Sequence, residues 1–468
     1  MQIGRKDLLW NYAATSMRIL SGIIVLPITL RMLPSEEMGI WSIFLSLVTI
    51  TSLLDFGFSN SFSRNITYVY SGVKELKTKG YAVAETSDID YSLLKSLLSA
   101  MKRYYGIVAL AFLIIFLVES PFYMFSILEQ YSGDRQPVWI AWFIFGGALT
   151  YELYTYYYNA ILTGRGLVKQ NMQIIVLSQS IRIVVTLAFL FAGMGIISLV
   201  LGLFISDVIS RTLAHRVFYD RETKDKLIDS SADSSWNTIK TLAPNSLKIG
   251  LVVLGLFLIS QSIILIAPFY LSLSEIAEYG ISKQLVALII SLSAIWFNTF
   301  YPQLSQYRVR EQYGDVKRLY IKSKLYAFLT VIFCGSALLL FGNDILILIK
   351  SKTALLNNHY LAIMVFFAIL NANQTIAMNT ILSSNEIPFY KAALASGIIT
   401  VCILVVMLKF TSLGVLSLIL APELTLCAYL YWKCNVIASN NINLKTSDYF
   451  LVIKMLLKNT QQLFSNKK

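Results

Sequence analysis

Apolar runs of roughly 20 residues recur from one end of this 468-residue chain to the other. A run of that length allows an α-helix to cross the hydrocarbon core of a bilayer, which is about 30 Å thick. Because hydrocarbon offers the backbone no hydrogen-bond partners, such runs fold as helices. Only 14% of the residues are charged, against about 25% in a typical soluble domain. The sequence therefore predicts an all-α polytopic membrane protein.

About twelve transmembrane helices are expected. An even number of spans places both termini on the same side, and most of the 39 lysines and arginines fall in the loops and termini of that side. Positively charged loops stay in the cytoplasm, so both termini are predicted to be cytoplasmic. The expected spans lie near 11–33, 39–61, 104–128, 138–163, 172–193, 196–216, 246–268, 279–302, 324–349, 358–383, 389–408 and 413–434.

A long polar segment near 217–240 divides the spans into six and six, which suggests an internal repeat. Aligning IVLPITLRMLPSEEMGIWS with LIAPFYLSLSEIAEYGISK places Pro27 on Pro268 and Glu37 on Glu278. Both halves begin with an outward span, so the repeat is parallel, and two six-helix lobes are expected around a central cavity. The expected parts are an N-terminal lobe 1–217, a cytoplasmic linker 218–245, a C-terminal lobe 246–436 and a cytoplasmic tail 437–468.

Two segments have the pattern of helices that lie on a membrane surface, with apolar residues on one face and lysines beside them. One is YSLLKSLLSAMKRYYG, residues 91–106, and the other is DYFLVIKMLLKN in the tail. Both are expected to anchor the chain at the membrane surface.

Several ionisable residues fall within the spans, where each costs at least about 2.5–3.5 kcal/mol and needs a partner. Arg18 and Asp55 lie at similar depths in the first two helices, so an ion pair between them is expected. An ion pair between Glu152 and Arg182 is expected for the same reason, because both lie near the middle of the membrane. Such pairs either hold helices in register or line a cationic cavity that accepts an anionic headgroup. Other ionisable residues within the spans include Asp207, Lys283 and Glu423.

The fourth span contains YELYTYYYNAILTGRG, in which Tyr151 and Tyr154 lie deep in the membrane on one helical face. Aromatic faces with hydroxyl groups suit sugar rings, although tyrosine also collects at membrane interfaces. These two tyrosines are therefore candidate substrate contacts.

The sequence contains none of the motifs of the common enzyme classes. GxxxxGK[ST], GxSxG and HExxH are absent, so no catalytic residue is assigned. The two histidines and four cysteines form no ligand pattern, and no metal or other cofactor is expected. The net charge of +13 follows from topology and gives no reason to expect nucleic-acid binding.

The N-terminal region resembles the Wzx-type O-antigen flippases, which belong to the polysaccharide transporter family of the MATE/MOP superfamily. The residues that carry the resemblance are RKDLLWNYAATSMRILSGIIVLPITLRMLPSEEMGIWSIF and LLDFGFSNSFSRN. The resemblance implies a flippase of the bacterial inner membrane that moves undecaprenyl-pyrophosphate-linked oligosaccharide to the outer leaflet. It also implies alternating access between two MATE-like lobes, and a polymerase or ligase of the same pathway as a partner.

By the same resemblance, Arg18, Arg31 and Arg182 are candidates to meet pyrophosphate or acidic sugars, with Lys283 in the second half. Asp55, Glu152, Asp207 and Glu423 are candidates to couple transport to protons or sodium, or to form ion pairs. Two alternatives stay open: a membrane-embedded polysaccharide polymerase or ligase, and a multidrug or lipid II exporter of the same superfamily.

Overall fold

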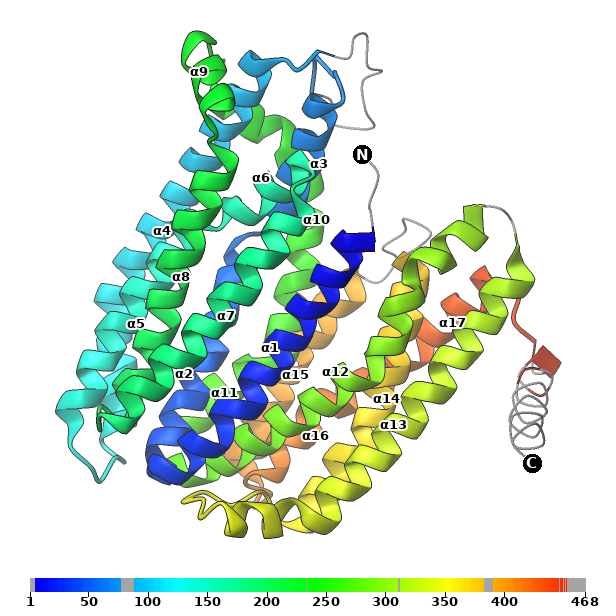
Figure 1. Ribbon diagram of the computed structural model, residues 1–468. Helices are drawn as coiled ribbons and strands as arrows, with labels where there is room; N and C mark the ends of the chain where they lie inside the picture. Colours follow the sequence, from blue (N-terminus) through cyan, green and yellow to red (C-terminus); the bar gives the residue numbers. More distant parts are fainter. Residues whose placement is uncertain are drawn as a thin grey trace, which may run out of the picture. The chain divides into compact units, whose positions relative to one another are not determined.

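The structure is a computed structural model that describes residues 5–76, 88–232, 234–309, 312–382 and 390–445, together with 447, 448, 450 and 452. All secondary structure in this part of the chain is helical, and no strand occurs in it (Figure 1). The predicted all-α class is therefore confirmed. The expected surface helix of the tail lies largely outside the described residues.

Two compact units divide the chain. The first comprises the residues up to Ala277 together with Ile349–Thr353, and the second comprises Glu278–Leu348 and the residues from Ala354 onward. The expected division lay earlier, in the polar segment 218–245. The helices that follow this segment pack with the first unit instead, so the division into six and six spans stays a prediction.

The helices of the first unit are α1 (Arg5–Met32), α2 (Ser35–Leu54), α3 (Phe58–Tyr70), α4 (Tyr91–Leu128), α5 (Arg135–Thr155), α6 (Tyr157–Arg165), α7 (Val168–Phe191), α8 (Ile196–Phe218), α9 (Arg221–Asp229), α10 (Ser235–Ser260), α11 (Ser262–Ile266) and the 3₁₀ turn η1 (Ala267–Phe269). α12 (Leu273–Val309) begins in this unit and continues in the second. The second unit also contains α13 (Tyr313–Leu348), α14 (Asn358–Leu382), α15 (Tyr390–Phe410), α16 (Leu416–Thr425), the π-helical turn η2 (Leu426–Leu430) and α17 (Tyr431–Asn441).

Nine helices in the described part of the chain are long and apolar enough to cross a membrane, or ten if the bent α10 counts as one span. About twelve were expected. The expected spans 138–163, 246–268 and 413–434 do not form single long helices. α10 bends by 66° just after Pro244, and α16 contains Pro422 shortly before the π-helical turn. Proline lacks an N–H and clashes with the preceding turn, which explains the bend of α10 and disfavours a regular helix around Pro422. The breaks at Gln261, between α10 and α11, and at Tyr156, between α5 and α6, contain neither proline nor glycine.

The second helix ends earlier than expected. α2 stops at Leu54, and Phe56 and Gly57 take φ angles of 47° and 74° before α3 begins. A Cβ atom at residue 57 would overlap Ile249 of α10, so glycine serves both the turn and the close packing. The residues after this turn therefore form a separate helix, α3, which includes Arg64.

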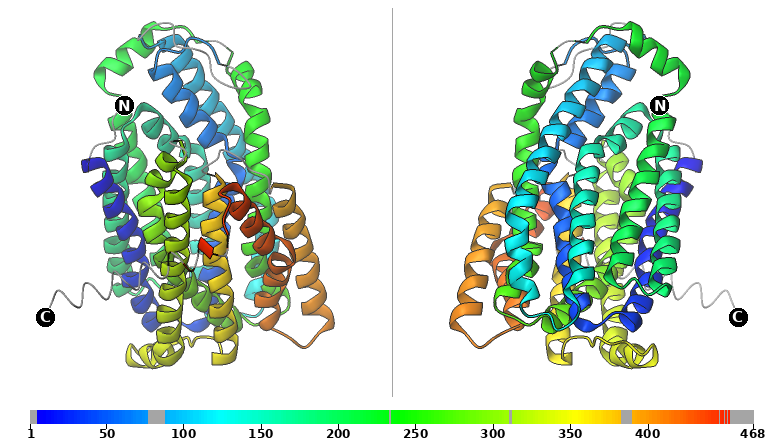
Figure 2. Two further views of the ribbon diagram at one scale, coloured as in Figure 1. Left: turned by 90° about the vertical axis from the view of Figure 1, so that its right-hand side faces the viewer. Right: turned by 90° about the vertical axis from the view of Figure 1, so that its left-hand side faces the viewer.

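α4 is one continuous helix of 38 residues. Its first part, 91–106, was expected to be a helix lying on the membrane surface. It is instead the N-terminal part of α4, and its apolar face, with Leu94, Leu97 and Met101, is buried inside the protein. At 1.5 Å per residue the helix is about 57 Å long, well beyond the roughly 30 Å of hydrocarbon. Its N-terminal turns therefore extend out of the membrane, where α9 packs against them (Figure 2).

α1 packs chiefly along α7. Its C-terminal end is met by the distant segment Ile349–Thr353, which belongs to the same unit. The Lys352 backbone amide donates to the Leu30 carbonyl at 2.8 Å, and its ammonium group donates to the Met32 carbonyl at 2.8 Å. These two bonds satisfy carbonyls that a helix end leaves without partners.

Gly146 and Gly147, adjacent on α5, test how α4 packs on α5. A Cβ atom at residue 146 would overlap the Phe116 ring of α4, whereas one at residue 147 meets nothing within 4 Å. We expect Gly146→Ala to destabilise the protein by about 1–3 kcal/mol through overpacking. Gly147→Ala should leave stability unchanged or slightly raised, because alanine favours helix. Thermal unfolding in detergent measures both, and equal melting temperatures would contradict this packing.

Asp220 ties α9 to the end of α6. Its carboxylate accepts hydrogen bonds from the Thr223 amide at 2.9 Å and from the Arg165 guanidinium at 2.8 Å. Hydrogen bonds from the Thr223 side chain and backbone, and then from Arg165, lower the pKa of Asp220 to about 2. A lowered carboxyl pKa means that the stabilisation is present above the unfolded value of about 3.9. It is lost as the pH falls towards about 2.

We therefore expect Asp220→Ala to loosen α9. Loss of an N-cap residue costs about 1 kcal/mol, so amide hydrogen exchange in 221–229 should accelerate about fivefold at neutral pH. Asp225→Ala, at an exposed position of the same helix, is the matched control. Exchange that rises equally in both variants would show that Asp220 does not hold α9.

Candidate functional site

Four charged side chains gather inside the first unit. Glu152 comes from α5, Arg182 comes from α7, and Asp207 and Arg211 lie one turn apart on α8. α8 packs against both α5 and α7. Glu152 interacts electrostatically with the other three side chains, and Arg182 interacts with Asp207. We call these four residues the charged cluster.

A glycine allows α8 to approach α7 beside the charged cluster. A Cβ atom at Gly202 would overlap the Thr186 hydroxyl and lie 3.3 Å from the Arg182 carbonyl oxygen. Because glycine has no side chain, the two backbones can come this close. The close approach explains how Arg182 of α7 comes within electrostatic range of Asp207 on α8.

The charged cluster is not locked into ion pairs. Each ion pair between described residues lies elsewhere in the chain. Thr51 of α2 donates to the Glu152 carboxylate at 3.4 Å. Arg211 is only 7% exposed, and its Nε has no hydrogen-bond partner in the described part of the chain. Because buried charges are costly without partners, this arrangement favours a further partner such as water, a cation or an anionic group.

The predicted ion pair between Asp55 and Arg18 is not formed. The Asp55 carboxylate accepts hydrogen bonds from the Tyr105 hydroxyl of α4 and from the Ser59 amide of α3, the latter at 2.9 Å. Arg18 is exposed on α1. The prediction assumed that the first two helices pack side by side because their connection is short. α1 packs chiefly along α7 instead, so Asp55 is satisfied by α3 and α4.

The other candidate residues of the first unit are dispersed. Tyr151 packs edge-on against Phe204, with ring centroids 6.2 Å apart, and interacts electrostatically with Arg211. It therefore lies beside the charged cluster. Tyr154 is 47% exposed, and Arg31 is exposed in the last turn of α1.

The second unit has polar groups of its own. The Glu423 carboxylate accepts hydrogen bonds from Asn371 at 3.1 Å and from the Tyr431 hydroxyl at 2.6 Å. The Lys283 ammonium group lies 5.9 Å from the Tyr279 ring centroid. Lys324 donates to the Asn435 side chain at 2.7 Å.

Arg211 and Lys324 were not among the sequence candidates. Arg211 falls near the end of the expected span 196–216 and Lys324 at the start of 324–349, so both were counted with the cytoplasmic loops beside those spans. The structure places Arg211 within α8 and Lys324 well inside the 36-residue α13. A usable signal was present for Arg211, because Asp207 lies four residues before it, on the same helical face. In the part of the chain that the structure describes, no three His, Cys, Asp or Glu side chains are grouped to hold a metal ion.

No protein-family model and no curated protein sequence matches the chain. Solved structures of low sequence identity do match, over most of their length. One is a multidrug resistance MATE family transporter of the MOP superfamily in its inward-facing conformation, with 14% identity and a TM-score of 0.62 over 95% of this chain and 98% of that one. A second is the lipid II flippase MurJ in an inward closed conformation, with 13% identity and a TM-score of 0.64 over 95% of this chain and 90% of that one.

A third is the MATE multidrug transporter DinF-BH, with 11% identity and a TM-score of 0.59 over 96% of this chain and 97% of that one. At these identities the likeness establishes the fold. The chain therefore has the fold of the MATE/MOP transporters, and the predicted MATE-like architecture is confirmed.

Two variants distinguish Tyr105 from Arg18 as the partner of Asp55. Tyr105→Phe removes a donor from a buried carboxylate, so we expect a loss of stability of about 1–3 kcal/mol. Arg18→Gln should leave the melting temperature unchanged, because Arg18 is exposed and forms no ion pair with Asp55. Thermal unfolding in detergent compares the two. A larger loss in Arg18→Gln than in Tyr105→Phe would restore the original ion-pair prediction.

Proposed function

We propose that the chain is a flippase of the bacterial inner membrane that moves undecaprenyl-pyrophosphate-linked oligosaccharide, such as an O-antigen repeat unit, to the outer leaflet. It works by alternating access, couples transport to protons or sodium, and keeps both termini in the cytoplasm. A polysaccharide polymerase or ligase of the same pathway uses the product. The proposal is supported by the fold, by the resemblance of the N-terminal sequence to Wzx-type flippases, and by the charged cluster.

The charged cluster is the observation that carries the proposal. Guanidinium groups bind phosphate oxygens through two parallel hydrogen bonds, so Arg182 and Arg211 are suited to pyrophosphate. Glu152 and Asp207 interact electrostatically with the same guanidinium groups. An anion on the arginines would therefore favour a proton or sodium ion on the carboxylates. This linkage would couple the two binding events.

The remaining candidates take different places in the proposal. Asp55 serves structure, because two hydrogen bonds already fix its carboxylate. Tyr151 adds an aromatic face beside the charged cluster, which suits a sugar ring. The other proposed substrate contacts or coupling residues stay predictions: Arg18, Arg31, Tyr154, Lys283 and Glu423.

A multidrug exporter is the second candidate function. Two of the solved structures with this fold are MATE multidrug transporters. Exporters and flippases of this fold differ in their substrates, so a test of substrate separates the two candidates.

Deletion of the gene tests the proposal. We expect surface polysaccharide to disappear and the lipid-linked unit to accumulate, with wild-type protein restoring both. Arg211→Gln should fail to restore the polysaccharide at normal protein level, because it removes a proposed pyrophosphate ligand. Arg135→Gln, which removes an exposed arginine at the start of α5, should restore it.

Surface polysaccharide that survives deletion in a strain without a related gene would contradict the flippase. Drug sensitivity together with intact polysaccharide would instead favour the exporter.

A further inference from the structure

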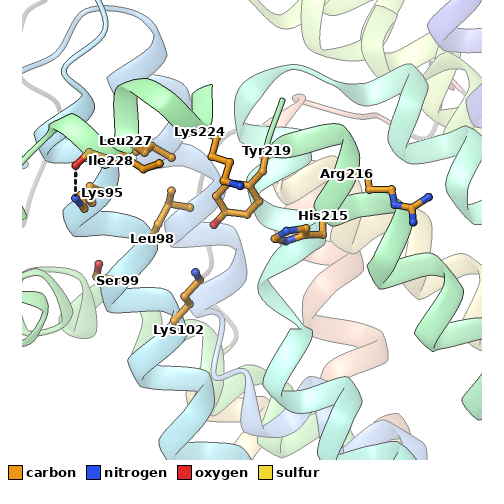
Figure 3. A pocket seen from close by; sticks show the side chains of 10 residues that line it. All are labelled: Lys95, Leu98, Ser99, Lys102, His215, Arg216, Tyr219, Lys224, Leu227 and Ile228. Atoms are coloured by element: carbon orange, nitrogen blue, oxygen red, sulfur yellow. Dashed lines mark hydrogen bonds between the residues drawn. The ribbon is translucent and has the colours of Figure 1, made fainter. Parts of the chain in front are cut away.

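A cavity of about 530 Å³ lies between the N-terminal part of α4, the end of α8, and α9 (Figure 3). We call it the headgroup pocket. Four cationic side chains line it: Lys95, Lys102, Arg216 and Lys224. None of its described lining residues is acidic. The pocket therefore gathers positive charge without a built-in counter-charge.

Lys102 and Lys224 are the cations best placed to bind a ligand. Lys95 already donates to the Ser230 carbonyl at 2.6 Å, and Figure 3 shows Arg216 pointing away from the other lining side chains. The Lys102 ammonium group lies 5.6 Å from the Tyr219 ring centroid. Neither Lys102 nor Lys224 takes part in an ion pair between described residues.

Two acidic residues near α9 are engaged outside the headgroup pocket. Asp220 forms an ion pair with Arg165 at 2.8 Å, and Glu222 forms one with Lys226 at 2.6 Å. Neither lines the pocket. Lys102 and Lys224 also interact electrostatically with the same His215 ring. Two like charges held close together repel each other, so an anion bound between them would be stabilising.

The depth of the headgroup pocket follows from α4. Exposed apolar side chains on this helix run from Ile107, 51% exposed, to Phe125, 58% exposed. That stretch is about 27 Å long, close to the roughly 30 Å of hydrocarbon in a bilayer. Lys102 precedes Ile107 by more than one turn. It therefore lies about 8 Å outside the apolar stretch, at the level of the lipid headgroups.

One wall of the headgroup pocket is apolar. Leu98 of α4 and Leu227 and Ile228 of α9 form it, and Ile228 is 65% exposed. A soluble anion would gain nothing from this wall, whereas a lipid would pack its glycerol and first acyl carbons there.

We propose that the headgroup pocket binds the phosphate of an anionic membrane lipid, with Lys102 and Lys224 as its ligands. The site is separate from the charged cluster and does not depend on which substrate the protein moves. A lipid bound here would bridge α4 and α9, and so would fix the start of the polar connection 218–245 at the membrane surface.

The test is lipid binding to the purified full-length protein in neutral detergent, followed by native mass spectrometry. Phosphatidylglycerol, phosphatidylcholine and inorganic pyrophosphate are the three probes. Lys102→Gln/Lys224→Gln removes the two proposed ligands. Arg103→Gln/Arg221→Gln is the matched control, because it removes the same charge from the same two helices at residues that do not line the pocket.

We expect phosphatidylglycerol to bind the wild-type protein more tightly than phosphatidylcholine does. Its affinity should fall about tenfold or more in the pocket variant and less than about twofold in the control variant, since each lysine near an anionic surface contributes to binding. Equal loss in the two variants, or no loss in the pocket variant, would overturn the proposal. Pyrophosphate binding as tightly as the lipid would overturn the lipid assignment and leave a site for soluble phosphate.

The single variants Lys224→Gln and Arg221→Gln repeat the comparison on α9 alone, if the double variant does not fold. Both positions are exposed, so neither change disturbs the core. Phosphatidylglycerol affinity that is lower in Lys224→Gln than in Arg221→Gln supports the headgroup pocket, and equal affinity contradicts it.

Discussion

A carboxylate inside a bilayer must find its hydrogen-bond donors within the protein, and much of the first unit is arranged around one that does. Asp55 ends α2, accepts the Ser59 amide at the start of α3 and accepts the Tyr105 hydroxyl of α4. The turn that follows it packs Gly57 against α10. One buried acid thus connects α2, α3 and α4 at a single break.

The side chains of the charged cluster also need partners within the protein, but they find them in a different way from Asp55. Its two arginines and two carboxylates interact electrostatically, yet none is held in an ion pair between described residues. Asp55 has its donors in place, whereas Arg211 keeps a buried Nε without a partner among the described residues. This contrast is why we propose a structural role for Asp55 and a transport role for the charged cluster. A group whose charges are only loosely compensated can exchange partners during a cycle at lower cost than a fixed pair.

The sequence was sufficient to predict the helical class and the approximate positions of most spans, because length and hydropathy determine them. It was not sufficient to predict which helices are neighbours. Arg18 and Asp55 were paired on the assumption that consecutive helices pack together, but α1 packs chiefly along α7. Hydropathy also says little about helices that continue beyond the membrane. Arg211 and Lys324, at the ends of their expected spans, were therefore counted with the adjoining loops, although α8 and α13 continue past them.

Transport by purified protein in liposomes tests the central claim most directly, namely that the arginines of the charged cluster bind the anionic group of the substrate. A fluorescent lipid-linked oligosaccharide is placed in one leaflet, and an impermeant quencher reports its arrival in the other. Wild-type protein and Lys169→Gln should move the lipid. Arg182→Gln, on the same helix, should move it no faster than protein-free liposomes do, although the variant is reconstituted as folded protein. Transport at the wild-type rate by Arg182→Gln would contradict the account.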